Sequence, residues 1–178
     1  MKTIESSAFS GCRNLSEVKL PASLKAIQSS VFHLCSALKT VFYDGSLEQW
    51  SHKINVANGF LGSSCPSLVT DDYTAQFILV KDDPYPPPKT VTITKYTGKE
   101  STVILPSTIS SWPVTKIGED ALKDNTTITS VTIPASVTEI GSNAFADCTN
   151  LTSVNYAGDW SNLMIQSGNP AVEDAANE

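Results

Sequence analysis

Several features that define common classes of protein are missing from this sequence of 178 residues. No apolar run approaches the roughly 20 residues that a membrane-spanning helix needs, and the first segment, MKTIESSAFSGC, lacks the apolar core of a signal peptide. Basic residues are few, 12 against 18 acidic ones, and no Lys/Arg cluster exists to neutralise a run of phosphates. We therefore expect neither membrane insertion nor nucleic-acid binding from this chain.

Residues that carry chemistry are also sparse. The two histidines, His33 and His52, are not joined to a Ser, Cys or Asp in a nucleophile motif. No two of the four cysteines have the Cys-x-x-Cys spacing of a zinc site, and no Gly-rich phosphate loop occurs. The acidic pairs at 71–72 and 82–83 lack the alternating spacing of a calcium loop. We expect no catalytic residue, no metal and no cofactor, and hence a protein that is not an enzyme.

Composition nevertheless fits a folded protein. A chain of 178 residues that is 40% apolar and 17% charged can form one or two domains with a sizeable core. The net charge of −6 comes entirely from residues 74–178, because residues 1–73 carry equal numbers of basic and acidic side chains. Residues 171–178 are polar and small, and we expect them to be a solvated acidic tail.

A repeat organises the rest of the chain. Residues 15–35 (LSEVKLPASLKAIQSSVFHLC) match residues 128–148 (ITSVTIPASVTEIGSNAFADC) position by position at an offset of 113, and the motif recurs at 23 residues within each copy. Fixed periods of this length indicate a solenoid, in which each unit buries its apolar side against the next.

One unit can be interpreted as structure. Val131 and Ile133 alternate with polar residues before Pro134, which is the pattern of a short, half-buried strand. A second β-branched run ends at Gly141. The next apolar residues have the spacing of one face of a single helical turn: Ala144, Phe145 and Cys148.

These residues carry a family resemblance. The segment ITSVTIPASVTEIGSNAFADCTN (128–150) resembles the BspA-type leucine-rich repeat, and residues 15–37 resemble it with two departures, Gln28 and Val31. Residues 93–122 are similar to the opening unit of such arrays, and the endings at 41–50 and 154–160 are similar to closing units. The resemblance implies a leucine-rich-repeat-like solenoid (α/β, mainly β) and a cell-surface or secreted protein that takes part in adhesion.

We expect four segments. They are a first cassette at 1–73, a Pro-rich strap with a connecting strand at 74–92, a second cassette at 93–170 and the acidic tail at 171–178. Either the two cassettes stack into one core or each is stabilised by its own opening and closing pieces, and we favour stacking. The prolines between 84 and 88 predict a stiff spacer, with a docking peptide for a proline-binding domain as the alternative.

The chain begins in mid-repeat, so Ile4, Ala8 and Phe9 would present an open apolar end. Terminal repeats normally carry a polar outer face. We therefore expect, as a hypothesis, that the chain is a piece of a longer array and that this end offers a surface for self-association.

Three cysteines share one repeat position and should form an inward column of small apolar residues: Cys12, Cys35 and Cys148. The spacing of neighbouring strands allows a disulfide between two of them, but parallel side-chain directions disfavour it. Cys65 lies outside the pattern as a loop thiol.

The outward row of the strands is where a solenoid keeps its binding surface. If Val18, Val41, Val131 and Val154 point inward, the candidate partner contacts that point outward are Lys19, Phe42, Ile104, Thr132 and Asn155. Phe42 and Ile104 are apolar in this row. Each is either covered by a neighbouring segment or an exposed anchor for a partner.

Two tryptophans recur in the closing units, where Trp50 and Trp160 follow Tyr43 and Tyr156. The recurrence favours packing of the last coil, and stacking against carbohydrate is the alternative. Three functions are therefore considered. The first is a non-enzymatic module that binds another protein, such as a host matrix or cell-surface protein. The second is a structural spacer that carries a separate functional domain, and the third is a carbohydrate-binding accessory.

Overall fold

The spacing of 23 residues places equivalent residues side by side, because equivalent strands of successive repeats pair in parallel. Val18 pairs with Val41, and Val131 pairs with Val103 on one side and Val154 on the other. The computed structural model describes residues 3–53, 55–56, 67–79, 88–110 and 112–177. The chain divides into two compact units, one formed by residues 1–90 and the other by residues 91–178.

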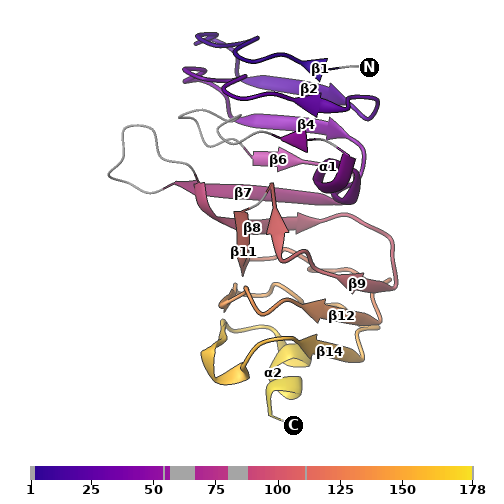
Figure 1. Cartoon of the computed structure of the whole chain (residues 1–178). Coiled ribbons are helices and arrows are strands. Elements are labelled where there is room, and N and C mark those ends of the chain that lie inside the picture. Colours follow the sequence, from indigo (N-terminus) through magenta and orange to yellow (C-terminus); the bar gives the residue numbers. More distant parts are fainter. Residues whose placement is uncertain (1–2, 54, 57–66, 80–87, 111, 178) are drawn as a thin grey trace. The chain divides into compact units, whose positions relative to one another are not determined.

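The first unit contains two sheets built from alternate strands (Figure 1). One sheet is parallel throughout and consists of β1 (Thr3–Ile4), β3 (Ala26–Ile27) and β5 (Asn55–Val56). The other has three parallel strands followed by an antiparallel one, and consists of β2 (Glu17–Pro21), β4 (Thr40–Asp44), β6 (Ser67–Val69) and β7 (Tyr73–Leu79). Helix α1 (Leu47–Lys53) follows β4.

The second unit repeats this plan (Figure 1). Its first sheet is parallel and consists of β9 (Thr102–Ile104), β12 (Ser130–Ile133) and β14 (Ser153–Tyr156). Its second sheet consists of β8 (Pro88–Tyr96), β11 (Trp112–Ile117), β13 (Glu139–Ile140) and β15 (Met164–Ile165), with β10 (Thr108–Ile109) antiparallel to β11. Strand β8 begins at the boundary between the units. The 3-10 helix η1 (Trp160–Asn162) and helix α2 (Pro170–Ala176) complete the unit.

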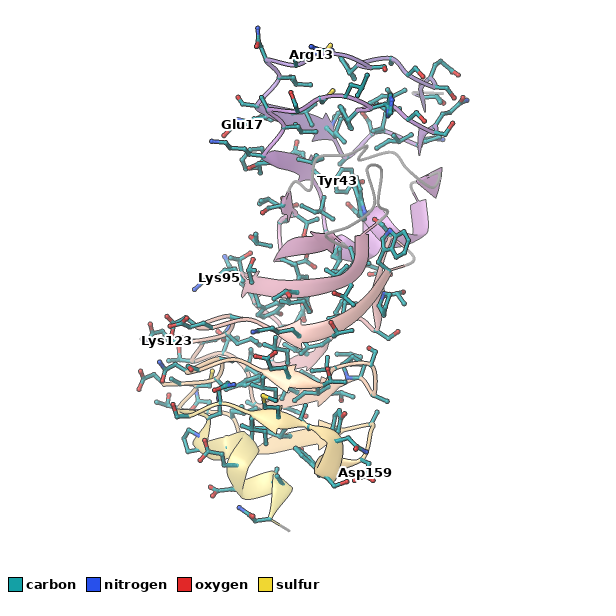
Figure 2. The ribbon with its side chains drawn as sticks, turned by 90° about the vertical axis from the view of Figure 1, so that its left-hand side faces the viewer. Arg13, Glu17, Tyr43, Lys95, Lys123 and Asp159 are labelled. Atoms are coloured by element: carbon teal, nitrogen blue, oxygen red, sulfur yellow. The ribbon has the colours of Figure 1, made fainter. Side chains whose placement is uncertain are left out.

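The periodic apolar residues form the core of each unit. Val41 is 1% exposed and Val131 is 0% exposed, and the two aromatic rings at the equivalent turn position, Phe32 and Phe145, are buried. Phe9 stacks on Phe32 with ring centroids 5.6 Å apart. Figure 2 shows Glu17 pointing away from the ribbon while Tyr43 lies inside it. The expected mainly-β solenoid is thus what the chain forms.

The turns between the strands differ from the expectation. Residues 142–147 form consecutive β-turns and not a helical turn, with left-handed backbone at Asn143 (φ 55°) and Asp147 (φ 58°). The reason is that the backbone amides of these turns donate hydrogen bonds in two directions. The Ala146 amide bonds back within its own turn, whereas the Asn143 amide donates to Ser167 of the next coil. A helix would direct all of these amides along its own axis and leave the neighbouring coil unpaired.

The expected acidic tail is also corrected. Residues 170–176 form helix α2, and Val172 on this helix is completely buried. Pro170 occupies the first turn, where its missing N–H costs nothing. The side chain of Asn169, just before the helix, is completely buried and bonds to the preceding coil. This segment therefore covers the last coil of its unit.

Some expectations fall outside the described residues. They are the spacer prolines Pro84, Pro86 and Pro87, the acidic pair at 82–83 and Cys65. Pro88 is the first residue of β8, where a residue without an N–H is tolerated. Among the described residues, no helix is long and apolar enough to cross a membrane.

Candidate protein-binding face

The outward row of the first unit is assembled as the alternation predicts. Phe42 on β4 lies directly beside Lys19 on β2 and beside Val69 on β6. Lys19 is exposed, and Phe42 and Val69 are half-buried. The Lys19 ammonium lies 5.8 Å from the centre of the Phe42 ring, a cation–π contact worth about 0.5–1 kcal/mol at an exposed site. The Lys19 ammonium therefore lies over the ring of Phe42.

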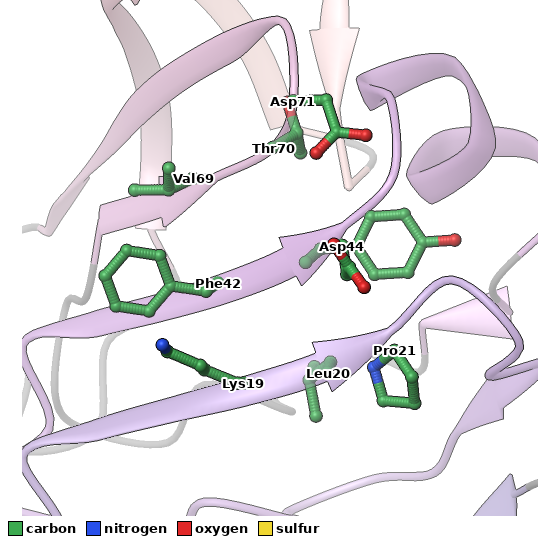
Figure 3. Close-up of a pocket in the computed structure, with 9 residues that line it drawn as sticks. Lys19, Leu20, Pro21, Phe42, Asp44, Val69, Thr70 and Asp71 are labelled. Carbon is green, nitrogen blue, oxygen red and sulfur yellow. The ribbon is translucent and has the colours of Figure 1, made fainter.

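A shallow groove of about 430 Å³ runs over these three strands (Figure 3). At one end are Lys19, Phe42 and Val69, and at the other are Asp44 and Asp71. Both aspartates are exposed. The groove thus has an apolar end and an acidic end.

The acidic end is held in place by the loop between β6 and β7. The Asp71 amide donates to the Gly45 carbonyl at 3.0 Å. The Asp72 carboxylate accepts bonds from the Leu47 amide at the start of α1 and from the Thr70 hydroxyl, both at 2.8 Å. Burial raises the pKa of the Tyr43 hydroxyl beneath the groove, and the Asp71 carboxylate raises this pKa further. Asp72 therefore has a structural role in capping α1, while Asp71 is left on the surface.

The outward row of the second unit is more polar. Thr132 lies between Ile104 and Asn155 in register, and Asn155 is exposed. Ile104 is 72% exposed, so none of the described residues covers its side chain. The row presents one isolated apolar side chain beside two polar ones.

The two tryptophans form equivalent contacts in their closing coils. Trp50 meets Tyr43 edge to face with ring centroids 5.3 Å apart, and Trp160 meets Tyr156 in the same way at 5.2 Å. Trp50 is 0% exposed, which corrects its candidacy as a carbohydrate contact because its indole offers no face to a ligand. Trp160 is half-buried.

The buried cysteines of the column pack in the core, and each also makes a hydrogen bond to the neighbouring coil. The Cys35 thiol donates to the Phe9 carbonyl at 3.0 Å, and the Cys148 thiol donates to the equivalent carbonyl of Leu122 at 3.1 Å. Burial is the main cause that raises the pKa of both thiols. Cys12 is exposed, contrary to the expectation, because no described coil lies on its outer side. All three are free thiols.

The other residues considered for chemistry are dispersed. His33 is half-buried in the turns of the first unit, and His52 lies in α1. Within the described ranges, no three His, Cys, Asp or Glu side chains are grouped so that they could hold a metal ion.

Sequence reasoning did not assign several residues to the groove, among them Val69, Asp71 and Asp44. Val69 and Asp71 lie in the stretch SLVTDDY, which does not follow the 23-residue pattern. The burial of Ser67, Leu68 and Val69 alternates as in a half-buried strand, but the sequence does not, because Leu68 and Val69 are both apolar.

Stacked coils of two short strands and a turn row, with outward residues in register, define a leucine-rich repeat solenoid. The chain belongs to the BspA-type leucine-rich repeat family, whose sequence profile matches six copies over residues 1–55 and 87–166. A comparison with curated proteins gives no match.

Solved structures with sequence similarity are also leucine-rich repeat proteins. One from T. pallidum is 33% identical over 47% of this chain (TM-score 0.41), and one from Bacteroides capillosus is 31% identical over 51% (TM-score 0.41). A leucine rich cell surface protein from Faecalibacterium prausnitzii is 41% identical over 53% (TM-score 0.42). This chain spans 36%, 64% and 24% of the lengths of those three chains.

Proposed function

We propose that this chain is a non-enzymatic repeat module of a cell-surface protein that binds another protein in adhesion, through the outer face of β2, β4 and β6. The observation that carries the proposal is the groove centred on Phe42, where a half-buried aromatic ring lies beside Val69 and under Lys19. Aromatic side chains with a partly apolar, partly charged surround are typical of the residues that dominate protein interfaces.

The geometry of the sheet supports this use of the face. Three parallel strands hold the row in register, so the groove is presented without the entropy cost of ordering a loop on binding. The core beneath it is closed by Leu20 and Tyr43, which are 3% and 2% exposed. Membership of the BspA-type family supports the surface and adhesion parts of the proposal.

The test is binding to an array of purified extracellular-matrix and cell-surface proteins. We expect at least one partner to bind the wild type and to bind Phe42→Ser at least tenfold more weakly, as for a central interface aromatic. Met164→Ser is the matched control, since Met164 is 59% exposed, lies on β15 of the second unit and does not line the groove. Circular dichroism checks that all variants are folded.

Two results would contradict the proposal. If every partner binds Phe42→Ser as well as wild type, the face is not the binding surface. If no protein in the array binds, the chain serves as a spacer that holds another domain at a distance.

A further inference from the structure

The groove on the first unit has two ends of different chemistry. Phe42 and Val69 form an apolar surface at one end, next to the Lys19 ammonium. Asp44 and Asp71 place two exposed carboxylates at the other end, and Figure 3 shows them well separated from Phe42 along the strands. A ligand that fills the groove therefore contacts an apolar surface at one end and two negative charges at the other.

The distance between these ends matches an extended peptide. Phe42 and Asp44 are two residues apart on β4, so their side chains leave the same face of the strand about 6.6 Å apart. A peptide in extended conformation has the same repeat, because its side chains at positions i and i+2 point to one side. If an apolar residue of the peptide packs on Phe42, the peptide side chain two positions further along lies at the carboxylates.

We propose that the groove binds an extended segment of the partner protein in which an apolar side chain is separated by one residue from Lys or Arg. This inference rests on the proposed function and adds the chemistry of the partner. The apolar side chain lies on Phe42 and Val69, and the basic side chain lies between Asp44 and Asp71. Lys19 sets the direction, because its positive charge repels a basic residue at the apolar end.

The net charge of residues 1–73 does not explain this preference. Residues 1–73 carry equal numbers of basic and acidic side chains, so the attraction is local to the acidic end of the groove. A local attraction between exposed charges is screened by salt over about 10 Å at 0.1 M. Affinity for such a segment should therefore fall as the salt concentration rises.

The test uses random twelve-residue peptides displayed on phage and selected on the full chain. We expect the selected peptides to be enriched in an apolar residue followed or preceded at two positions by Lys or Arg. A selected peptide, made synthetically, should bind Asp44→Asn/Asp71→Asn about three- to tenfold more weakly than wild type. Phe42→Ser should abolish its binding.

The matched control is Asp124→Asn/Asp147→Asn. It changes the net charge by the same amount, and both residues are exposed in the turns of the second unit and do not line the groove. This variant should bind the peptide as wild type does. A loss equal to that of the groove variant would overturn the inference, because net charge and not the groove would then control binding.

The remaining outcomes separate the two proposals. Peptides that need Phe42 but lack a basic residue and bind the groove variant normally would overturn this inference and leave the proposed function standing. If no selected peptide depends on Phe42, the inference is also overturned, and the protein array alone decides whether the face binds a partner.

Discussion

The side chain of Asn169 should contribute more to stability than any other polar side chain of the last coil. Its oxygen accepts a bond from the Phe145 amide at 3.0 Å, and its nitrogen donates to the carbonyls of Gly141 and Gln166 at 3.0 and 2.7 Å. Asn169 is 0% exposed, so water cannot replace these bonds without opening the coil. The substitution Asn169→Ala removes all three.

The cost follows from what each lost bond leaves behind. The Gly141 carbonyl keeps a bond from the Ala144 amide, and Gln166 is only half-buried, so these two acceptors lose about 0.5–1.5 kcal/mol each. The Phe145 amide has no other bond in this coil and costs about 1–3 kcal/mol when left unpaired. We expect a total loss of about 2–6 kcal/mol, a large part of the stability of a small domain.

The assay is equilibrium unfolding in urea followed by circular dichroism. With a urea slope of about 2 kcal/mol per M, a loss of this size lowers the midpoint by roughly 1–3 M urea. Hydrogen exchange measured on peptides from both units shows where the loss occurs, and protection should fall around residues 141–172 and stay unchanged in residues 15–50.

Asn177→Ala is the matched control, because Asn177 is exposed and makes one bond, from its side chain to the Glu173 carbonyl at 2.7 Å. It should cost no more than about 0.5 kcal/mol. If Asn169→Ala costs no more than Asn177→Ala, the segment before α2 does not hold the last coil, and the reasoning fails.

Three further predictions concern other parts of the chain. In a Cys65→Ser background at neutral pH, Cys12 should react with a thiol reagent rapidly, and Cys35 only on unfolding, because Cys35 is buried and burial raises its pKa. The Ser161 hydroxyl and amide lower the pKa of the Asp159 carboxyl, so the stability it adds is present above about pH 4 and is lost as the pH falls through the lowered pKa. Trp50→Ala should cost about 3–5 kcal/mol, and Trp160→Ala clearly less, in urea unfolding.

Each of these has its own contradicting result. Equal labelling rates for Cys12 and Cys35 would show that the thiol reagent reaches Cys35 in the folded protein. A stability difference between wild type and Asp159→Asn that does not shrink as the pH falls below 4 would exclude the carboxylate bond to Ser161 as its source. If Trp160→Ala costs as much as Trp50→Ala, the two closing coils bury their rings equally.

The parts of the fold that repeat were predictable, because period and burial coincide. Val41, Val131, Phe32 and Phe145 recur at fixed spacing and form the core. The left-handed turns were missed although a signal existed. Asp, Asn and Gly tolerate positive φ better than other residues, and they hold five of the eight positive-φ positions in the turns of the repeats: Gly11, Asp120, Asp124, Asn143 and Asp147. The other three are held by Ser7, Ser30 and Leu34, so the signal is weak in the first unit.

Structural features that occur only once in the chain could not be predicted from the 23-residue repeat. Helix α2 follows the last repeat, and the short segment 171–178, which contains three acids, is predicted to be a solvated tail unless the burial of Val172 is known. The groove depends on the outward position of Val69 and on the loop that carries Asp71, both contributed by a segment outside the repeat. Sequence alone located Lys19 and Phe42 in one row but could not supply their neighbours.

The central claim, that the outer face of β2, β4 and β6 binds a protein, is tested most directly by a hydrogen-exchange footprint. The full chain is compared with and without a partner identified on the protein array. We predict slower exchange at residues 17–21, 40–44 and 67–71 and no change in the turns at 28–35. Protection confined to the turns or to the second unit would contradict the claim.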